Sequence, residues 1–238
     1  MGATVSRCLE LAEADGPCAS QVSINAAKVV EAQRNTRMAN FIGRCELASA
    51  DGQAVVWAAR LLGTPLPERV AGIDLMHALI AEAAVRGLSV FFLGAREEVL
   101  QTAVARIRES HPALEIAGTR DGYFPDDRED EVVAEIAAAR PAILFIAISS
   151  PHKEEFIDRN RDRLGARFAM GVGGALDVVA GRARRAPVWM QSWGLEWLYR
   201  LAQEPTRMFR RYAVGNGRFA WLLVKELVHR RRNAGSRG

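Results

Sequence analysis

Polar and glycine-rich residues follow several short apolar runs of this chain, and these residues could do chemistry. Asp51 carries a carboxylate that could take a proton from a hydroxyl, as a general base must. The glycine stretch 171–174 could let a phosphate approach backbone N–H groups at the start of a helix. The other positions of this kind are Asn25, Gly94, Asp121-Gly122-Tyr123 and Ser149–Glu154. Such residues are compatible with binding a phosphorylated ligand and moving a proton.

The same residues have structural interpretations, which are the more frequent ones when nothing else is known. Asp51-Gly52 is common turn chemistry, because Asp caps its own backbone and Gly takes positive φ. Asn25 is suited to capping a helix over 26–42. The glycine stretch is as compatible with a tight turn as with a phosphate loop, because it is not a G-x-G-x-x-G fingerprint. A functional assignment therefore depends on where the fold places these residues.

The elements that must position them alternate along the chain. Short β-rich apolar runs are separated by longer segments with helical periodicity, which predicts an α/β fold with a Rossmann-like, mainly parallel sheet flanked by helices. Strands are expected near 21–24, 46–48, 89–93, 115–117, 143–148 and 168–172, with none apparent before Ser20. The carboxyl ends of parallel strands share one edge, where α/β sheets bind ligands, so we expect one cleft to use all of these positions. Residues 1–192 are expected to form this core.

The C-terminal residues 193–238 differ in character from the rest of the chain. From residue 200 onward there are ten Lys or Arg against two Glu, whereas the preceding residues carry 22 basic and 26 acidic side chains. Aromatic and apolar residues lie between these charges. We therefore expect a basic, amphipathic helical appendage whose partner is anionic, such as a phosphate, a nucleic acid or a membrane surface.

Three arginines of the appendage have helical spacing. Arg207, Arg210 and Arg211 stand at i, i+3 and i+4, which places their guanidinium groups on one face of a helix. Planar guanidinium forks pair well with the oxygens of a diphosphate. A solvated basic face is the alternative, but the bulky apolar residues nearby make it less suitable, and the sequence has no nucleic-acid recognition motif.

Several classes of function are disfavoured by what the sequence lacks. The four histidines and three cysteines have no metal-ligand spacing, and no Asp-x-Asp pair is present, so no metal is expected. The odd number of cysteines favours a reducing compartment, the cytoplasm. The sequence shows no leader and no apolar run near the ~20 residues that span a bilayer, so membrane contact is expected to be peripheral. A dinucleotide oxidoreductase is disfavoured because its glycine fingerprint is missing.

Many ordered landmarks give the chain a family resemblance. Between residues 22 and 212 it resembles the WecG/TagA/CpsF family, glycosyltransferase family 26. The matching stretches are 23–30, Ala50-Asp51-Gly52, 68–75, 92–94, Gly122-Tyr123-Phe124, Pro151 with Glu154, 171–177, Arg185-Ala186-Pro187 and 194–200. Their number and order make this resemblance far more specific than any single motif.

The resemblance implies an inverting, metal-independent transfer of a sugar from a nucleotide donor, typically UDP-linked. The acceptor would be a polyprenyl-diphosphate-linked sugar at the inner face of a bacterial cytoplasmic membrane. Matching the family's motifs makes Asp51 the catalytic base. The implied substrate-binding residues are Ser23 and Asn25 at the sugar, Tyr123 near the nucleotide, Arg69, Gly94, Glu154, Gly173, Gly174, and Arg200, Arg207 and Arg210 of an appendage that closes over the site.

Two positions depart from the family's pattern. The common Gly-Pro-Lys-Gln-Glu stretch is Ser150 to Glu154 here, so Lys153 stands where a glutamine near the nucleotide is usual. Ser23 replaces a threonine. An ammonium at position 153 could favour an acidic sugar or take over a phosphate contact, and the sequence leaves both open.

The sequence therefore predicts a glycosyltransferase of envelope or exopolysaccharide synthesis, cytoplasmic and peripherally bound to the inner leaflet. Its partners would be a UDP-sugar donor and a polyprenyl-diphosphate-linked acceptor, with no cofactor and no nucleic acid. A homo-oligomer is compatible with the sequence, which defines neither the oligomeric state nor the two sugars. The alternative is a non-catalytic, Rossmann-like nucleotide- or nucleic-acid-binding protein with a polyanion-binding tail, which would have no need of the Asp51 carboxylate.

Overall fold

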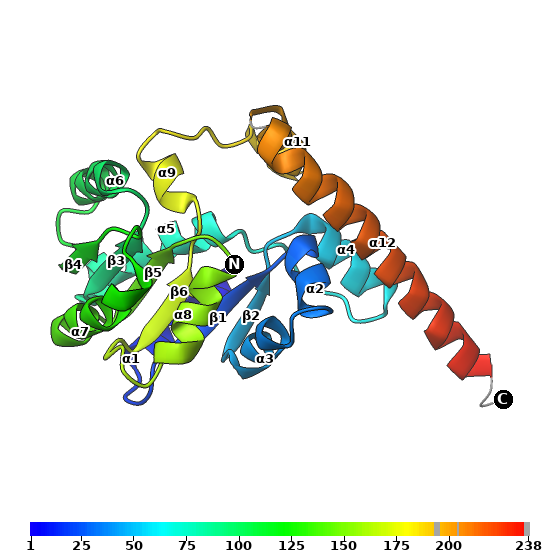
Figure 1. Ribbon diagram of the computed structural model, residues 1–238, viewed down its shortest axis with the longest axis horizontal. Helices are drawn as coiled ribbons and strands as arrows, with labels where there is room; N and C mark the ends of the chain where they lie inside the picture. Colours follow the sequence, from blue (N-terminus) through cyan, green and yellow to red (C-terminus); the bar gives the residue numbers. More distant parts are fainter. Residues whose placement is uncertain (193–195, 204, 236–238) are drawn as a thin grey trace. The chain divides into compact units, whose positions relative to one another are not determined.

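The computed structural model describes residues 1–192, 196–203 and 205–235. Within them, six strands form one sheet in the order β2-β1-β6-β5-β3-β4. The pairings of β1 with β6, β6 with β5, β5 with β3 and β3 with β4 are all parallel. Helices flank this sheet (Figure 1). The predicted α/β class, its parallel sheet and its C-terminal helix are confirmed.

All six predicted strands are present, with ends that differ by a few residues. They are β1 (Ala19–Ile24), β2 (Leu47–Ala50), β3 (Val90–Gly94), β4 (Ile116–Arg120), β5 (Ile143–Ala147) and β6 (Phe168–Gly171). The largest shift is in β4, which continues to Arg120 because its pairing with β3 extends to the Leu93–Arg120 register. Backbone pairing, and not apolar content, sets the end of that strand.

The chain groups into two compact units. Unit 1 comprises residues 1–23, 37–49 and 70–184, and unit 2 comprises residues 24–36, 50–69 and 185–238. The helices that lie mainly or wholly in unit 1 are α1 (Gly2–Glu13), α3 (Thr36–Arg44), α5 (Gly72–Arg86), α6 (Glu97–Ser110), α7 (Glu129–Ala139), α8 (His152–Asn160) and α9 (Ala175–Val179), with a 3₁₀ turn, η1, at Asp126–Arg128. The predicted boundary between residues 192 and 193 adjoins residues outside the described part of the chain and stays a prediction.

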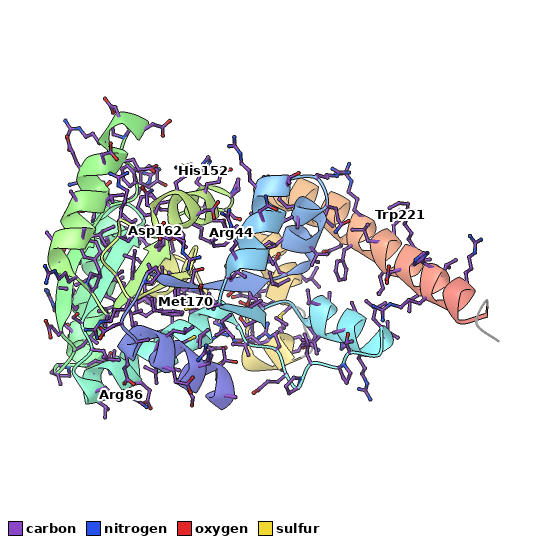
Figure 2. All side chains as sticks on the ribbon, turned by 90° about the horizontal axis from the view of Figure 1, so that it is seen from below. Arg44, Arg86, His152, Asp162, Met170 and Trp221 are labelled. Atoms are coloured by element: carbon purple, nitrogen blue, oxygen red, sulfur yellow. The ribbon has the colours of Figure 1, made fainter. Side chains whose placement is uncertain are left out.

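The core of unit 1 follows from the two-residue period of its strands. Phe92 and Phe145 stack with ring centroids 5.5 Å apart and belong to the same buried cluster as Phe168 and Met170. Residues of α1, α5, α6 and α9 complete this cluster. The alternate strand residues, such as Phe91, are buried on the opposite face. Figure 2 shows Arg86 of α5 and His152 of α8 on opposite sides of the strand that carries Met170.

Unit 2 consists of helices and two strand ends. Its helices are α2 (Ala26–Ala32), α4 (Gln53–Leu61), α10 (Val188–Ser192), α11 (Glu196–Gln203) and α12 (Pro205–Gly235). The long α12 packs against α2 (Figure 1). Near its end, Arg230 donates a hydrogen bond from Nη1 to the carbonyl oxygen of Leu62, just after α4, at 2.6 Å. Segments far apart in the sequence are thereby joined in one unit.

No helix in the described ranges is long and apolar enough to span a membrane.

Candidate functional site

Asp51 and Asn25 follow two neighbouring strands, β2 and β1, in unit 2. The backbone N–H groups of Asp51 and Gly52 both donate to the carbonyl oxygen of Ile24, at 2.9 and 3.3 Å. A Cβ added to Gly52 would lie 3.3 Å from the Cβ of Asn25, so the two strand ends are in van der Waals contact. These contacts fix the backbone of the half-buried Asp51 where β2 ends, and a carboxylate at a strand end can serve to take a proton.

Asn25 has the capping role that its residue type favours. Its Oδ1 accepts a hydrogen bond from the backbone N–H of Lys28 at 3.0 Å, which satisfies a donor in the first turn of α2. The cap fixes the side chain beside Gly52. Direct contact of Asn25 with a sugar stays a prediction.

Arg69 belongs to a cluster of charges in unit 2. Its Nη1 lies 3.2 Å from Oε2 of Glu196, and the Nε of Arg185 lies 3.9 Å from the other oxygen of that carboxylate. The side chains of Arg69 and Glu196 are only 16% and 14% exposed. Glu196, the first residue of α11, thus brings two guanidinium groups together. The sequence flagged Glu196 and Arg185 as family landmarks but did not reveal that they meet Arg69.

Lys153 lies over the glycine stretch in unit 1. A Cβ at Gly171 would stand only 2.7 Å from Cδ and Cε of Lys153, so the glycine leaves room for the lysine stem. The Nζ of Lys153 lies 3.9 Å from the Cβ position of Gly173, whose φ is 54°. The structure therefore brings together the ammonium group and the loop that leads through Gly174 into α9. An ammonium beside a tight glycine loop is a suitable place for phosphate oxygens.

Glu154 is a buried carboxylate next to that lysine. Its Oε2 accepts a hydrogen bond from the hydroxyl of Ser150 at 2.8 Å, and its Oε1 lies 3.5 Å from Nζ of Lys153. Only 2% of the residue is exposed. These contacts make Glu154 the partner that holds Lys153, whereas a direct contact between Glu154 and a substrate stays a prediction.

Gly94 is required by packing where β3 ends. Its φ is 125°, and a Cβ there would stand 2.5 Å from the carbonyl carbon of Ala147. Gly122 packs on the other side, since its own Cβ would come within 2.8 Å of the Gly94 Cα. Any larger residue at position 94 would separate the ends of β3 and β5. A role for Gly94 in substrate binding remains a prediction.

Tyr123 follows this packed turn and presents its ring to solvent. The residue is 71% exposed, and its backbone N–H donates to Oδ1 of Asp121 at 3.0 Å. The guanidinium carbon of Arg96 lies 5.6 Å from the ring centroid. An exposed aromatic ring of this kind can stack against a nucleotide base.

Ser23, near the end of β1 in unit 1, lies beside Gln21 and Gly72, two neighbours that the sequence did not indicate. Its Oγ accepts a hydrogen bond from Nε2 of Gln21 at 3.3 Å. Gly72 at the start of α5 is close by, because a Cβ there would lie 3.3 Å from the Ser23 Oγ. The serine hydroxyl is thus enclosed on two sides while the residue stays half-buried.

The predicted arginines of the appendage lie in α11 and α12. The positions of the side chains of Arg200, Arg207 and Arg210 fall outside what the structure describes. Their contacts with a diphosphate therefore stay predictions.

Unit 1 carries a glycine loop and an ammonium group after a parallel strand, the kind of place at which α/β sheets bind ligands, and unit 2 carries Asp51 and a cluster of guanidinium groups. The sequence profile of the Glycosyl transferase WecG/TagA/CpsF family matches residues 1–233. The chain belongs to this family, and it is a glycosyltransferase.

Two curated relatives are similar to this chain over most of its length. One, from Bacillus spizizenii, is 37% identical over 184 residues, covering 77% of this chain and 71% of the relative. Another, from Bacillus subtilis strain 168, is 36% identical over 176 residues, covering 74% of this chain and 67% of the relative. Both are named N-acetylglucosaminyldiphosphoundecaprenol N-acetyl-beta-D-mannosaminyltransferase.

Proposed function

We propose that this protein transfers an N-acetylmannosaminyl group from a UDP-linked donor to a polyprenyl-diphosphate-linked N-acetylglucosamine, in the synthesis of a bacterial envelope or exopolysaccharide polymer. Family membership and the names of the two relatives support the donor and acceptor classes. The observation that carries the chemistry is the placement of Asp51 directly after β2, where its backbone N–H donates to Ile24 at the end of β1 and the next residue, Gly52, packs against Asn25.

The proposed reaction is a single in-line displacement at the anomeric carbon. The acceptor hydroxyl forms the new bond to that carbon, and its proton passes to Asp51. The bond to the UDP oxygen breaks, and the charge that develops on the diphosphate is stabilised by donors of the protein. We assign this last role to Lys153, to the amides of Gly173 and Gly174, and to Arg69 with the appendage arginines. We assign Ser23 and Asn25 to contacts with the donor sugar, and Tyr123 to stacking on the uracil ring of UDP.

The surroundings of Lys153 favour a phosphate contact over an acidic sugar. The ammonium group lies beside the glycine loop, 3.9 Å from the Cβ position of Gly173, and such loops offer backbone N–H groups to phosphate oxygens. Its partner Glu154 is buried and fixes the side chain in that place. We therefore assign Lys153 to the diphosphate, at the position where a glutamine near the nucleotide is usual in the family.

We also propose that α12 holds the enzyme on the inner leaflet of the cytoplasmic membrane. Trp221, Val224 and Val228 are 62%, 58% and 43% exposed and recur at i, i+3 and i+7 on one face. Figure 2 shows Trp221 directed outward from α12. Lys225 lies 5.4 Å from the Trp221 ring, so a cation accompanies the apolar face. Interfacial aromatics with basic residues bind anionic bilayers reversibly.

Acceptor-dependent release of UDP tests the proposal. The purified protein is incubated with UDP-N-acetylmannosamine, with UDP-N-acetylglucosamine or with UDP-linked acidic sugars, with and without a short-chain polyprenyl-diphosphate N-acetylglucosamine. We expect fast UDP release only from UDP-N-acetylmannosamine and only with the acceptor present. Preference for another donor would correct the sugar, and no acceptor-dependent release from any donor would refute the function.

A further inference from the structure

Gln21 is a polar residue in the interior of the sheet. It lies in β1 in register with Met170 of β6, and only 2% of it is exposed. Ser23, two residues further along β1, is on the same face of the sheet. Met170 belongs to the apolar cluster with α1 and α5. An aliphatic residue would fit this setting without burying an amide, so the presence of a glutamine here requires an explanation.

The amide of Gln21 connects two serine hydroxyls. Its Nε2 donates to Oγ of Ser49 on β2 at 2.7 Å and to Oγ of Ser23 at 3.3 Å. A hydroxyl has one proton to donate and two lone pairs to accept with. Because both serines accept from the same amide, each keeps its own proton for a different acceptor. Gln21 thereby sets Ser23 as a hydrogen-bond donor toward its surroundings.

The amide is not explained by stability alone. The Oε1 atom of Gln21 is buried and has no hydrogen-bond partner within the described residues. A buried acceptor without a partner is destabilising. Ser49 is 7% exposed, so of the two hydroxyls only that of the half-buried Ser23 is near the surface. The network therefore leads from the sheet interior to one side chain at the strand end.

We propose that Gln21 is a positioning residue for sugar binding, which fixes the Ser23 hydroxyl so that it donates to an oxygen of the donor sugar. This inference rests on the proposed function, because it takes Ser23 as part of the sugar site. The ligand group must be a hydrogen-bond acceptor, such as an acetamido carbonyl or a ring hydroxyl oxygen. Gln21 itself touches no substrate and acts only through Ser23.

Replacing the amide by an apolar side chain of similar length tests the proposal. Gln21→Met removes both donors and the buried unpartnered oxygen. We expect the KM and Kd for the UDP-sugar donor to rise about two- to ten-fold, the range for one neutral hydrogen bond. The kcat should change less than about two-fold, because the contact holds the sugar equally before and during transfer. The thermal midpoint should stay the same or rise, which is opposite to the effect of losing a structural residue.

A double-variant cycle separates this role from a general effect on the sheet. Ser23→Ala should raise KM as much as Gln21→Met does, and adding Gln21→Met to Ser23→Ala should change KM no further. Ser49→Ala, which removes the other hydroxyl on the same amide, is the matched control and should leave KM within about two-fold. A lower thermal midpoint for both Gln21→Met and Gln21→Leu would make the amide a structural group and overturn the inference, whereas if only Gln21→Met is destabilised, Gln21→Leu takes its place in the cycle.

The outcomes distinguish this inference from the proposed function. A folded Gln21→Met enzyme with wild-type KM and Kd overturns the inference and leaves the proposed function standing. The same conclusion follows if the effects of Gln21→Met and Ser23→Ala on KM are additive. If the wild-type protein shows no acceptor-dependent UDP release, the proposed function fails. In that case the inference is tested by comparing the Kd for the UDP-sugar between the wild type and the Gln21→Met and Ser23→Ala variants.

Discussion

The two units of the molecule differ in charge and in what they expose. Unit 1 contains 17 Lys or Arg against 22 Asp or Glu, whereas unit 2 contains 15 against 6. Of the ten exposed large apolar or aromatic residues in the described ranges, eight belong to unit 2 and only Val85 and Tyr123 to unit 1. The whole-chain charge of +4 conceals this contrast.

This contrast indicates that the two units have different roles. Unit 1 buries the aromatic core and carries its glycine loop with Lys153. Unit 2 combines excess positive charge with exposed apolar side chains, the composition expected of a surface that meets an anionic, lipid-linked partner. Both units contain an Asp-Gly pair after a strand, Asp121-Gly122 in unit 1 and Asp51-Gly52 in unit 2.

The largest expected effect on turnover comes from substituting the aspartates of these two Asp-Gly pairs. Asp51→Asn should lower turnover by ~10²-fold or more, the usual scale for losing a general base, with unchanged donor binding. Asp121→Asn is the matched control. The Asp121 carboxylate accepts a hydrogen bond from the N–H of Tyr123, which an amide oxygen can also accept, so its turnover should stay within about three-fold. Steady-state UDP release by both variants provides the measurement, and equal effects would remove Asp51 from the mechanism.

The arginines of α12 should matter for chemistry more than for membrane binding. Arg207→Ala with Arg210→Ala should lower kcat/KM by about ten-fold or more, because each guanidinium loses charge-assisted bonds to the diphosphate. Co-sedimentation with anionic vesicles should fall much less. Arg218→Ala, in the same helix, serves as the control for charge alone. If the double variant loses no more kcat/KM than Arg218→Ala does, Arg207 and Arg210 lie on a solvated face and do not contact the diphosphate.

The apolar face of α12 should show the reverse pattern. Trp221→Ser with Val224→Ser should reduce binding to vesicles of phosphatidylglycerol and phosphatidylethanolamine by about ten-fold, given the apolar area removed. Transfer to a water-soluble short-chain acceptor should change little. Val85→Ser in unit 1, which is 83% exposed, is the matched control. Vesicle binding by the double variant at the wild-type level would show that α12 is not a membrane contact.

Lys153 tests the contribution of unit 1 to the diphosphate. Lys153→Gln should raise the KM for UDP-N-acetylmannosamine about two- to ten-fold, because a charged donor to phosphate is replaced by a neutral one. His152→Gln, the exposed neighbour, should leave KM unchanged. The inhibition constant of UDP should rise in parallel. A switch in sugar preference with an unchanged UDP constant would assign Lys153 to the sugar instead.

The smallest effect is a pH dependence of stability in unit 1. Burial would raise the pKa of Glu46, but hydrogen bonds from Arg161 and the N–H of Ser20 outweigh it and hold the pKa below the ordinary value of 4.5. A lowered pKa stabilises the fold above pH 4.5, and this contribution is lost as pH falls through the folded-state value.

Urea unfolding from pH 7 to pH 3 measures that contribution. Glu46→Gln should be about 1–2 kcal/mol less stable than the wild type at pH 7, and the difference should shrink toward pH 3. Glu10→Gln, which removes an exposed ion pair with Arg7, should be nearly neutral throughout. A difference for Glu46→Gln that stays constant with pH would mean that its charge is not the cause.

Much of the fold was predictable because it follows from local patterns. Each buried strand is an apolar run long enough to recognise. The single helix predicted over 26–42 is wrong, because the chain turns at residues 33–35 between α2 and α3. The strand ends were less accurate, because pairing across the sheet extends β4 to Arg120 beyond its apolar residues. The places of Asp51 and Asn25 were also predictable, since they follow strands directly.

The remaining features depend on contacts between distant residues. Glu196 meets Arg69 across 127 positions of sequence. Unit 2 gathers three separated segments, which no local pattern shows. Gln21 is a polar residue at the start of a predicted strand, and its burial depends on the distant residues that β2 and β6 bring beside it. Lys153 departs from the family's pattern in the sequence, but the packing of its stem over Gly171 depends on how β6 and α8 are brought together by the fold.

The stereochemistry of transfer tests the central claim most directly, because in-line attack assisted by Asp51 permits one outcome. The anomeric configuration of the sugar is followed by time-resolved ¹H NMR as wild-type enzyme transfers it from an α-linked UDP donor to the short-chain acceptor. A single displacement predicts that the first product formed is β-linked, with inversion. A product that retains the α configuration would contradict the account, since retention requires another mechanism and a different role for Asp51.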